Sequence, residues 1–228
     1  MKSRGQLGNE SPIPYFRYSA TAGLGATLLY GDLERHPVGP AIYLNWNYFL
    51  THGLSIGVEF QEGLLWGEDW VLTDGIRRRA LNFYHAGIFG FNFQPIKFMQ
   101  DDHLRRIEYR QSWARRAVNS IFVGAGMGLT YNLQWNRQRV VDVNDDVLPA
   151  HDGKDRGVSY IVTTHAGIEL PLHSLKPDLL DSYIWNLVIR GQLGLALNDE
   201  LDGYSGTYPG NDDRDVYGLL SIGINLRF

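Results

Sequence analysis

The sequence of 228 residues lacks cysteine, and it has no uninterrupted run of 18 or more apolar residues. The first absence excludes disulfides and thiolate chemistry. The second excludes a membrane-spanning helix, which needs about 20 consecutive apolar residues. The His-Glu-x-x-His pattern and the paired Cys/His spacings of common metal sites are also missing. We therefore predict no catalytic residue, no metal site and no cofactor.

Charge and mean hydropathy are low as well. The formal net charge is −4, 44% of the residues are apolar, and the mean hydropathy is −0.24. These averages do not exclude a membrane β-barrel, because only every second residue of its strands faces lipid. The 26 glycines and the aromatic content of 13% fit a barrel with a crowded interior and aromatic residues at the membrane interfaces. The order of apolar and polar residues along the chain therefore has to distinguish a membrane barrel from a soluble protein.

The last fourteen residues follow a strict alternation of two residue types. Leu220 and Ile222 belong to a face that is almost wholly apolar, whereas Ser221 and Asn225 belong to a mostly polar or small face. A long strand that ends on Phe228 resembles the closing strand of a bacterial outer-membrane β-barrel. In that family the terminal Phe and its alternating neighbours form the signal for the barrel-assembly machinery. For this segment alone, the alternative is the half-buried edge strand of a soluble protein.

Seven other segments alternate in a similar way. Residues 16–30 are the clearest, with aromatic side chains near both ends of fifteen residues, and about 9–11 residues suffice to cross the hydrocarbon. An even number of strands closed into a barrel leaves no unpaired edge. The prediction is an all-β fold, an eight-stranded antiparallel transmembrane β-barrel that forms one domain over 1–228, with a flexible segment at 1–14. The predicted strands are 16–30, 40–49, 54–66, 80–93, 120–133, 158–170, 185–198 and 215–228.

The connections after the odd-numbered strands are polar and rich in Gly, Asp and Arg, so we expect them to be extracellular and both chain ends to be periplasmic. The expected location is therefore the cell outer membrane. The start Met-Lys-Ser-Arg-Gly-Gln has no apolar signal-peptide core. Because such a barrel has to be exported, we expect that the natural signal peptide has been removed. The four polar connections are 31–39, 67–79, 134–157 and 199–214.

Five charged residues fall at positions predicted to face the lumen. An eight-stranded barrel is just filled by its inward side chains, and an unpaired charge in such an interior is costly. We therefore predict a lumenal ion-pair network. It is either a structural plug of salt bridges, which we favour and which small barrels resembling OmpA have, or part of a gated ion path or proton relay. The residues are Arg17, Glu59, Glu169, Arg190 and Arg227.

The connection at 94–119 is too long for an ordinary periplasmic turn. From 97 to 116 it has six basic and three acidic residues, a net charge of +3. Asp101 or Asp102 is placed to cap a helix, which predicts one short periplasmic helical insertion. This segment is either a docking surface for a periplasmic partner or a helix on anionic lipid headgroups. Its basic residues are Lys97, Arg105, Arg106, Arg110, Arg115 and Arg116.

An enzymatic function needs separate consideration, because some small outer-membrane barrels act on lipids. A Ser-His-acid group on the outer wall would suit such chemistry, since the substrate lies in the leaflet. His85 is the one histidine predicted to face outward within a strand, and no serine lies near it in the sequence. We predict that the protein is not an enzyme. A lipid-modifying outer-membrane enzyme remains the third class of function.

Several short motifs together resemble the small outer-membrane barrels of Bacteroidota. They include barrels similar to PorG of the type IX secretion system and are OmpA-like in architecture. The motifs are Tyr-Gly-Asp-Leu at 30–33, Gly-Pro-Ala-Ile-Tyr-Leu-Asn-Trp-Asn-Tyr-Phe at 39–49, Leu-Ser-Ile-Gly-Val-Glu-Phe-Gln-Glu-Gly at 54–63, Arg-Ala-Leu-Asn-Phe at 79–83 and Phe-Asn-Phe at 91–93.

The resemblance implies a non-enzymatic structural or anchoring protein that docks periplasmic partners. PorG-like proteins are thought to anchor a periplasmic ring of the secretion motor to the outer membrane, and they have no catalytic residues to carry over. The alternative is a minor porin or a surface ligand-binding barrel acting through the loops at 134–157 and 199–214. The expected partners are outer-membrane lipid, lipopolysaccharide and a periplasmic protein; we expect no nucleic-acid partner.

Overall fold

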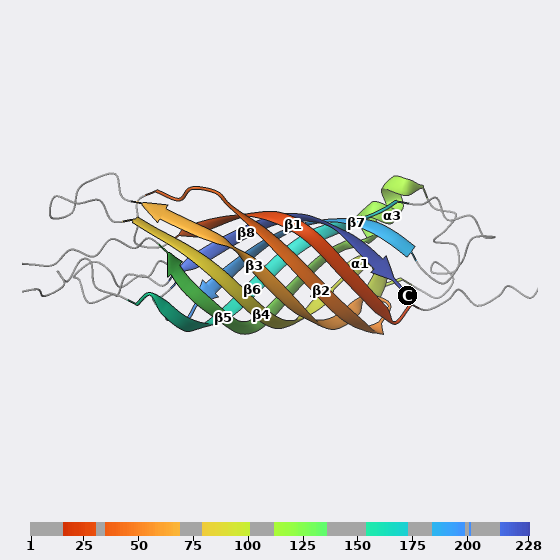
Figure 1. Cartoon of the computed structure of the whole chain (residues 1–228). Coiled ribbons are helices and arrows are strands. Elements are labelled where there is room, and N and C mark those ends of the chain that lie inside the picture. The colour runs from red at the N-terminus through yellow and green to blue at the C-terminus, as the bar shows by residue number, and fades with distance from the viewer. Residues whose placement is uncertain are drawn as a thin grey trace, which may run out of the picture.

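The computed structural model describes residues 16–30, 35–68, 79–100, 112–135, 154–172, 184–198, 201 and 215–228. Eight strands form a closed barrel in which each strand pairs antiparallel with its neighbours in chain order and β1 pairs with β8 (Figure 1). The predicted eight-stranded antiparallel barrel is confirmed. The strands are β1 (Tyr18–Tyr30), β2 (Gly39–Thr51), β3 (Leu54–Glu68), β4 (Arg79–Phe93), β5 (Ile121–Trp135), β6 (Arg156–Pro171), β7 (Ile184–Ala196) and β8 (Val216–Arg227).

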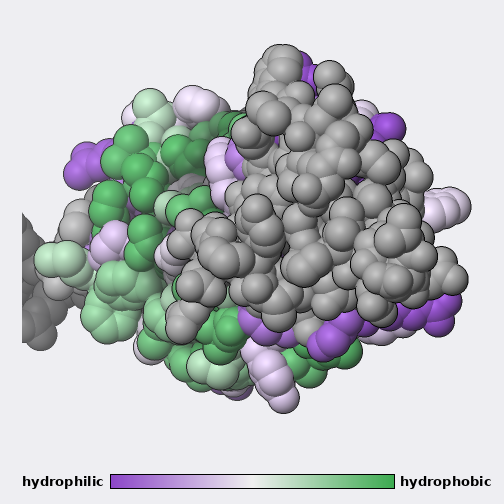
Figure 2. Space-filling model, turned by 90° about the vertical axis from the view of Figure 1, so that its left-hand side faces the viewer, coloured by the Kyte–Doolittle hydropathy of each residue, from purple (hydrophilic) through white to green (hydrophobic). Residues whose placement is uncertain are grey.

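The outer wall of the barrel is apolar. Leu24, Phe60 and Met127 are between 63% and 69% exposed, although their side chains cannot form hydrogen bonds with water. In the space-filling view, hydrophobic side chains gather on the part of the wall that is visible beside the grey atoms, with some hydrophilic residues among them (Figure 2). Their partners in the alternation, such as Thr21 and Gln61, are buried in the interior. Period-two alternation therefore separates an apolar outside from a largely polar inside, as the sequence predicts.

The two ends of the barrel differ. At the end that we call the terminal end, Tyr18 begins β1, and Tyr18 and Phe228 exchange two backbone hydrogen bonds of 3.0 Å. The Phe228 ring stacks on Tyr18 with a centroid distance of 6.0 Å and meets the edge of Trp46 at 5.5 Å. These contacts close the seam between β1 and β8. The opposite end, where β1 reaches Tyr30 and β4 begins at Arg79, is the distal end.

Two short helices lie at the terminal end in the connection between β4 and β5 (Figure 1). They are α1 (Pro95–Phe98) and α3 (Trp113–Asn119). Ser112 caps α3 by accepting a hydrogen bond from the backbone N–H of Arg115 at 3.4 Å. The predicted capping residues Asp101 and Asp102 lie outside the described residues. Within the described part of the chain, no helix is long and apolar enough to cross a membrane.

Strand boundaries differ from the predicted ones by a few residues. β3 continues to Glu68 and β5 to Trp135, because their neighbours still offer pairing partners: Arg79 lies opposite Glu68, and Leu81 lies opposite Trp135. β1 begins at Tyr18 rather than at residue 16. Arg17 therefore precedes β1, although its backbone oxygen accepts a hydrogen bond from Phe49.

Candidate functional site

An ion pair between Glu59 of β3 and Arg190 of β7 lies across the middle of the lumen. The guanidinium of Arg190 donates to both carboxylate oxygens of Glu59, with a distance of 2.8 Å from Nη2 to Oε1. The two side chains are 6% and 5% exposed. Arg190 also lies over the ring of Tyr43, 4.5 Å from its centroid. A bidentate charge-assisted contact of this kind is among the stronger polar interactions in proteins.

Amide side chains extend this ion pair towards the terminal end. Asn45 donates to Glu59 at 3.0 Å, and Asn47 donates to Asn45. Asn92 of β4 donates to Asn47 at 2.9 Å, and Nε2 of His165 lies 2.6 Å from the side-chain oxygen of Asn92. The chain of contacts thus ties β2, β3, β4 and β6 together through the lumen. A buried polar network that is satisfied in this way makes the interior rigid.

A second branch of the network runs towards the distal end. Gln61 donates to Glu59 and, at 3.1 Å, to Gln192. Gln192 donates to the hydroxyl of Tyr217 at 3.2 Å, and this hydroxyl lies 3.3 Å from the side-chain oxygen of Gln61. The three side chains form a closed triangle between β3, β7 and β8. Together the two branches place hydrogen-bonded polar groups on both sides of the ion pair.

Of the five charged residues predicted to form one lumenal network, four form two ion pairs. Besides Glu59 with Arg190, Arg227 of β8 donates to Glu169 of β6, with side chains 12% and 13% exposed. Arg227 also lies 4.7 Å from the ring centroid of Phe49. Arg17 is exposed and belongs to neither pair. It lies just before β1 at the terminal end, where its backbone oxygen still accepts a hydrogen bond from the N–H of Phe49 at 2.8 Å, so its predicted place in the lumenal network is wrong.

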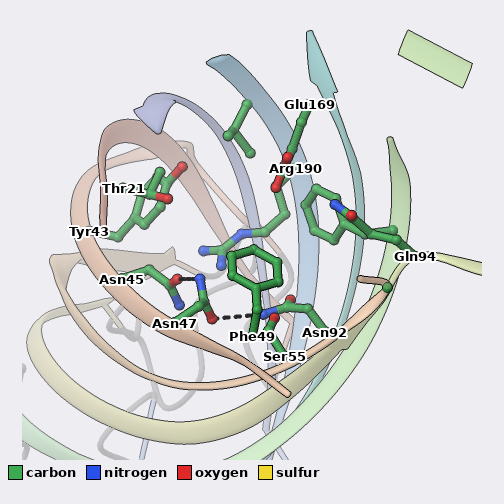
Figure 3. Close-up of a pocket in the computed structure, with 13 residues that line it drawn as sticks. Thr21, Tyr43, Asn45, Asn47, Phe49, Ser55, Asn92, Gln94, Glu169 and Arg190 are labelled. Atoms are coloured by element: carbon green, nitrogen blue, oxygen red, sulfur yellow. Dashed lines mark hydrogen bonds between the residues drawn. The ribbon is translucent and has the colours of Figure 1, made fainter. Parts of the chain in front are cut away.

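A polar cavity occupies the terminal half of the lumen (Figure 3). Its lining includes Arg190 and Glu169, one residue from each ion pair, and the amides of Asn45, Asn47 and Asn92. The three asparagines also line a neighbouring cavity that reaches Glu59 and His165. These two cavities extend from the terminal end to the Glu59–Arg190 pair and to Gln192 beside it.

The distal half of the lumen is closed by an apolar cluster and by Leu201. The backbone oxygen of Leu201 accepts hydrogen bonds from Asn82 at 2.7 Å and from Gln134 at 2.8 Å, and its N–H donates to Asp215 at 2.7 Å. Leu201 is thereby held in the mouth of the barrel with 1% exposure. This arrangement supports a structural plug rather than an open ion path. The cluster consists of Leu29, Leu65, Tyr84, Ala86, Ile88, Ile161, Ala196, Leu201 and Tyr217.

The basic segment differs from its prediction. Lys97 and Arg116 are each 6% exposed, so they do not contribute to an exposed basic surface. Both lie in the helices that pack at the terminal end, and neither is without a partner. Arg115 is exposed, as predicted. The remaining three basic residues, Arg105, Arg106 and Arg110, lie outside the described residues.

His85 faces outward, as predicted, and has an acidic neighbour that the sequence did not reveal. Its Nδ1 lies 3.0 Å from Oε1 of Glu62, the residue opposite it on β3. In the described strands around this pair, the adjacent outward side chains are apolar, aromatic or glycine, so no serine or threonine is placed as a nucleophile. The letters Gly-x-Ser-x-Gly occur at 53–57, but Ser55 is 3% exposed within β3 rather than at a strand-to-helix turn.

These features define a closed eight-stranded β-barrel with an apolar outer wall and a polar lumen that Leu201 and the apolar cluster block. No family model matches the chain, and no curated protein matches it. Several solved structures are similar to it, although at low identity. The outer-membrane protein Ail of Yersinia pestis is 12% identical with a TM-score of 0.48, and the match covers 94% of this chain and all of Ail.

Neisserial surface protein A is 11% identical with a TM-score of 0.45; the match covers 92% of this chain and 97% of the other. The outer-membrane enzyme PagL is 13% identical with a TM-score of 0.33, covering 91% and 97% of the two chains. Ail has been solved with the heparin analogue sucrose octasulfate. At these identities, neither the enzymatic activity of PagL nor the ligand of Ail extends to this chain.

Proposed function

We propose that this protein is a non-enzymatic barrel of the bacterial outer membrane that anchors a periplasmic protein at its terminal end, as the resemblance to PorG-like barrels of the type IX secretion system implies. The observation that carries the proposal is an exposed surface on α1, α3 and the residue after α1. Met99 is 82% exposed, and Trp113 is 54% exposed. We call this the rim surface: Phe98, Met99, Trp113, Arg115 and Val118.

The outer wall supports a membrane location. Contiguous exposed apolar surface of this extent makes a soluble protein aggregate, whereas hydrocarbon is its natural solvent. The closed barrel pairs every strand on both sides, so no sheet edge faces lipid. Tyr18, Trp46 and Tyr48 pack together on the outside at the terminal end, in the manner of an aromatic girdle at a membrane interface.

The connection between β2 and β3 supports a periplasmic terminal end. It consists of His52 and Gly53 alone, since β2 ends at Thr51 and β3 begins at Leu54. Outer-membrane barrels have short turns on the periplasmic side and longer loops outside. The four connections that follow odd strands begin at the distal end; the one after β1 spans eight residues, and those after β3, β5 and β7 span ten or more. These lengths support an outward distal end, with the connections from β4 and β6 (94–120 and 172–183) as long exceptions at the terminal end.

The rim surface has the composition of a docking site. Tryptophan and methionine are enriched in protein interfaces, and arginine supplies charge pairing at their edge. The indole N–H of Trp113 donates to the backbone oxygen of Pro171 at 3.0 Å, which holds the ring against the end of β6. A side chain held in advance loses less entropy on binding. The partner that fits is a protein with an apolar groove and an acidic residue at its edge.

The test is a pull-down from native membranes in mild detergent. A variant with Met99→Ser, Trp113→Ser and Arg115→Glu removes the apolar contacts and reverses the charge while leaving the buried Lys97 and Arg116 intact. We expect wild type to retain a periplasmic protein and the variant to lose most of it. Val38→Ser is the matched control, because Val38 is 62% exposed at the distal end.

Heat-modifiable gel migration establishes that each variant remains folded. The proposal is wrong if no periplasmic protein accompanies the wild type, or if the folded rim variant keeps every partner. Loss of the partner from the Val38→Ser control as well would also contradict a specific rim contact.

A second candidate is that α3 lies on lipid headgroups, because Trp113 and Arg115 are the residue types that membrane interfaces favour. Quenching of Trp113 fluorescence by brominated lipid, with no protein partner retained, would establish this role instead. The porin or ligand-binding alternative depends on the loops at 134–157 and 199–214, which lie largely outside the described residues. In the described strands no serine or threonine lies beside His85, whose register partner on β5 is Tyr131; this favours a non-enzymatic role over a lipid-modifying enzyme.

A further inference from the structure

The apolar outer wall is interrupted by one polar pair. Among outward-facing residues of the described strands, the acidic, basic and histidine residues are Glu62 and His85, together with three residues at the distal strand ends (Glu68, Arg79 and Arg156). Glu62 and His85 are direct register partners on β3 and β4. Their side chains are 51% and 38% exposed. Glu62 and His85 are thus the two that lie away from the strand ends, and they are placed against each other.

This pair needs a reason beyond folding. Ionisable side chains on the lipid face of a barrel are costly, and a leucine and a phenylalanine at these positions would suit the wall better. The mutual contact uses Nδ1 of His85 and Oε1 of Glu62. It leaves Nε2 of His85 and Oε2 of Glu62 for a group outside the barrel. The pair therefore presents one hydrogen-bonding nitrogen and one acceptor oxygen side by side.

The missing side chain of Gly87 leaves open space on the wall beside the pair, and we call this space the groove. Gly87 lies two residues from His85 on the same face of β4, and a Cβ added there would meet only Cε1 of Phe60, at 4.0 Å. On the other side of His85, the Phe83 ring meets the imidazole edge to face, with a centroid distance of 4.7 Å. Phe83 orients the imidazole, while Gly87 and Phe60 leave room for a hydrocarbon chain along the wall.

The depth of the pair indicates which part of a lipid it meets. On β3, Glu62 lies four residues before Trp66 and six before Glu68, where the strand ends. With about 3.3 Å per residue and a tilt of about 45°, this places the pair roughly 9–14 Å below the distal rim. The phosphates and sugars of the lipid lie closer to the distal end of the barrel. The polar groups available at this depth are those attached to the acyl chains, namely hydroxyls, esters and amides.

We propose that Glu62 and His85 form a binding site for a lipid of the distal leaflet whose acyl chains are amide-linked and hydroxylated, the chemistry of the lipid part of lipopolysaccharide. Glu62 accepts a hydrogen bond from an amide N–H of the lipid. Nε2 of His85, whose Nδ1–H is directed at Glu62, accepts one from an acyl-chain hydroxyl. The acyl chain lies in the groove beside Gly87. The inference rests on the proposed outer-membrane location with the distal end outward, and it is independent of the partner at the rim surface.

The test uses the full chain folded into nanodiscs of phosphatidylethanolamine with purified lipid A. The barrel is extracted in mild detergent, and the lipid A retained per barrel is measured by mass spectrometry. We expect the double variant Glu62→Leu/His85→Phe to bind lipid A about ten-fold more weakly, the equivalent of about 1.4 kcal/mol. Gly87→Leu, which fills the groove and leaves the pair intact, should also weaken retention. The control is Thr164→Val, an outward polar residue on β6.

A purely structural role predicts the opposite behaviour. If the pair only stabilised the wall, the double variant would unfold more easily in nanodiscs without lipid A, whereas we expect it to be at least as stable as the wild type. Unchanged lipid A retention in the double variant overturns the proposal. So does equal retention of phosphatidylglycerol, which has neither amide-linked nor hydroxylated chains.

Two other outcomes have distinct meanings. In the first, the wild type forms cross-linked dimers, the double variant does not, and lipid retention is unchanged. The pair would then contact a second copy of the protein, and the lipid site would be overturned. Failure of the wild type to show heat-modifiable migration in nanodiscs would contradict the membrane location itself. Loss of the periplasmic partner from the rim variant bears only on the anchoring role.

Discussion

Removing either partner of the Glu59–Arg190 pair should destabilise the barrel, but the two single variants should differ. In Arg190→Ala, the Glu59 carboxylate keeps the amide donors of Asn45 and Gln61. In Glu59→Ala, the guanidinium of Arg190 keeps the Tyr43 ring but loses its carboxylate. Breaking a buried ion pair costs about 3–5 kcal/mol of unfolding free energy. We expect a cost near 3 kcal/mol for Arg190→Ala and near 5 kcal/mol for Glu59→Ala, within this range.

The other ion pairs supply an internal scale. Arg227→Ala breaks a pair whose side chains are 12% and 13% exposed, so it should cost less than Arg190→Ala. Arg35→Ala breaks the contact with Glu68 at 3.0 Å, where the side chains are 37% and 24% exposed. Surface pairs are worth about 0–1 kcal/mol, so this variant should be almost neutral. Urea unfolding in phospholipid vesicles, followed by tryptophan fluorescence, measures the unfolding free energy of each of these variants.

A charge-free double variant provides the decisive comparison. Glu59→Gln with Arg190→Gln removes both charges and leaves amides that can still bond to Asn45 and Gln61. Because no buried charge remains unpaired, it should cost less than Glu59→Ala alone. The reasoning fails if the double variant costs the sum of the single variants, or if Arg190→Ala is no more destabilising than Arg35→Ala.

Three further predictions follow from the packing. The pure protein in planar bilayers should show small or no conductance, because Leu201 and the apolar cluster close the distal lumen; a large, steady, ion-selective current would favour a channel. Gly128→Ala should destabilise by about 1–3 kcal/mol in urea unfolding, because its Cβ would lie 2.0 Å from the backbone oxygen of Gly87, whereas Gly191→Ala meets nothing within 4 Å and should be tolerated. Phe228→Ala should lower stability by about 1–2 kcal/mol through lost ring contacts with Tyr18 and Trp46, and an unchanged urea midpoint would contradict that contribution.

The strands and their faces could be predicted from the sequence because they depend on local alternation. A residue in a strand faces away from its two neighbours, so a run such as that of β1 assigns Leu24 outward and Thr21 inward before any pairing is known. The even strand count and the closed barrel follow from the number of such runs. The same logic placed Glu59, Glu169, Arg190 and Arg227 towards the lumen.

Which inward charges meet could not be predicted in this way. Glu59 and Arg190 are 131 residues apart in the chain, and they meet only because closure of the barrel brings β3 and β7 to opposite sides of one lumen. Arg17 lies at the end of the barrel, where a residue that continues the alternation no longer has lumen side chains around it to pair with. Alternation carries no information on which strands face each other or on how deep in the lumen a residue lies.

Tertiary structure alone decided the remaining features. The contact of Glu62 with His85 depends on the register between β3 and β4. The closure of the distal lumen depends on the hydrogen bond that Asn82 donates to the backbone oxygen of Leu201. The burial of Lys97 depends on how α1 packs against the end of the barrel. Each of these depends on distances between segments far apart in the chain. Local residue patterns determine the direction of a side chain, whereas register and closure determine what it touches.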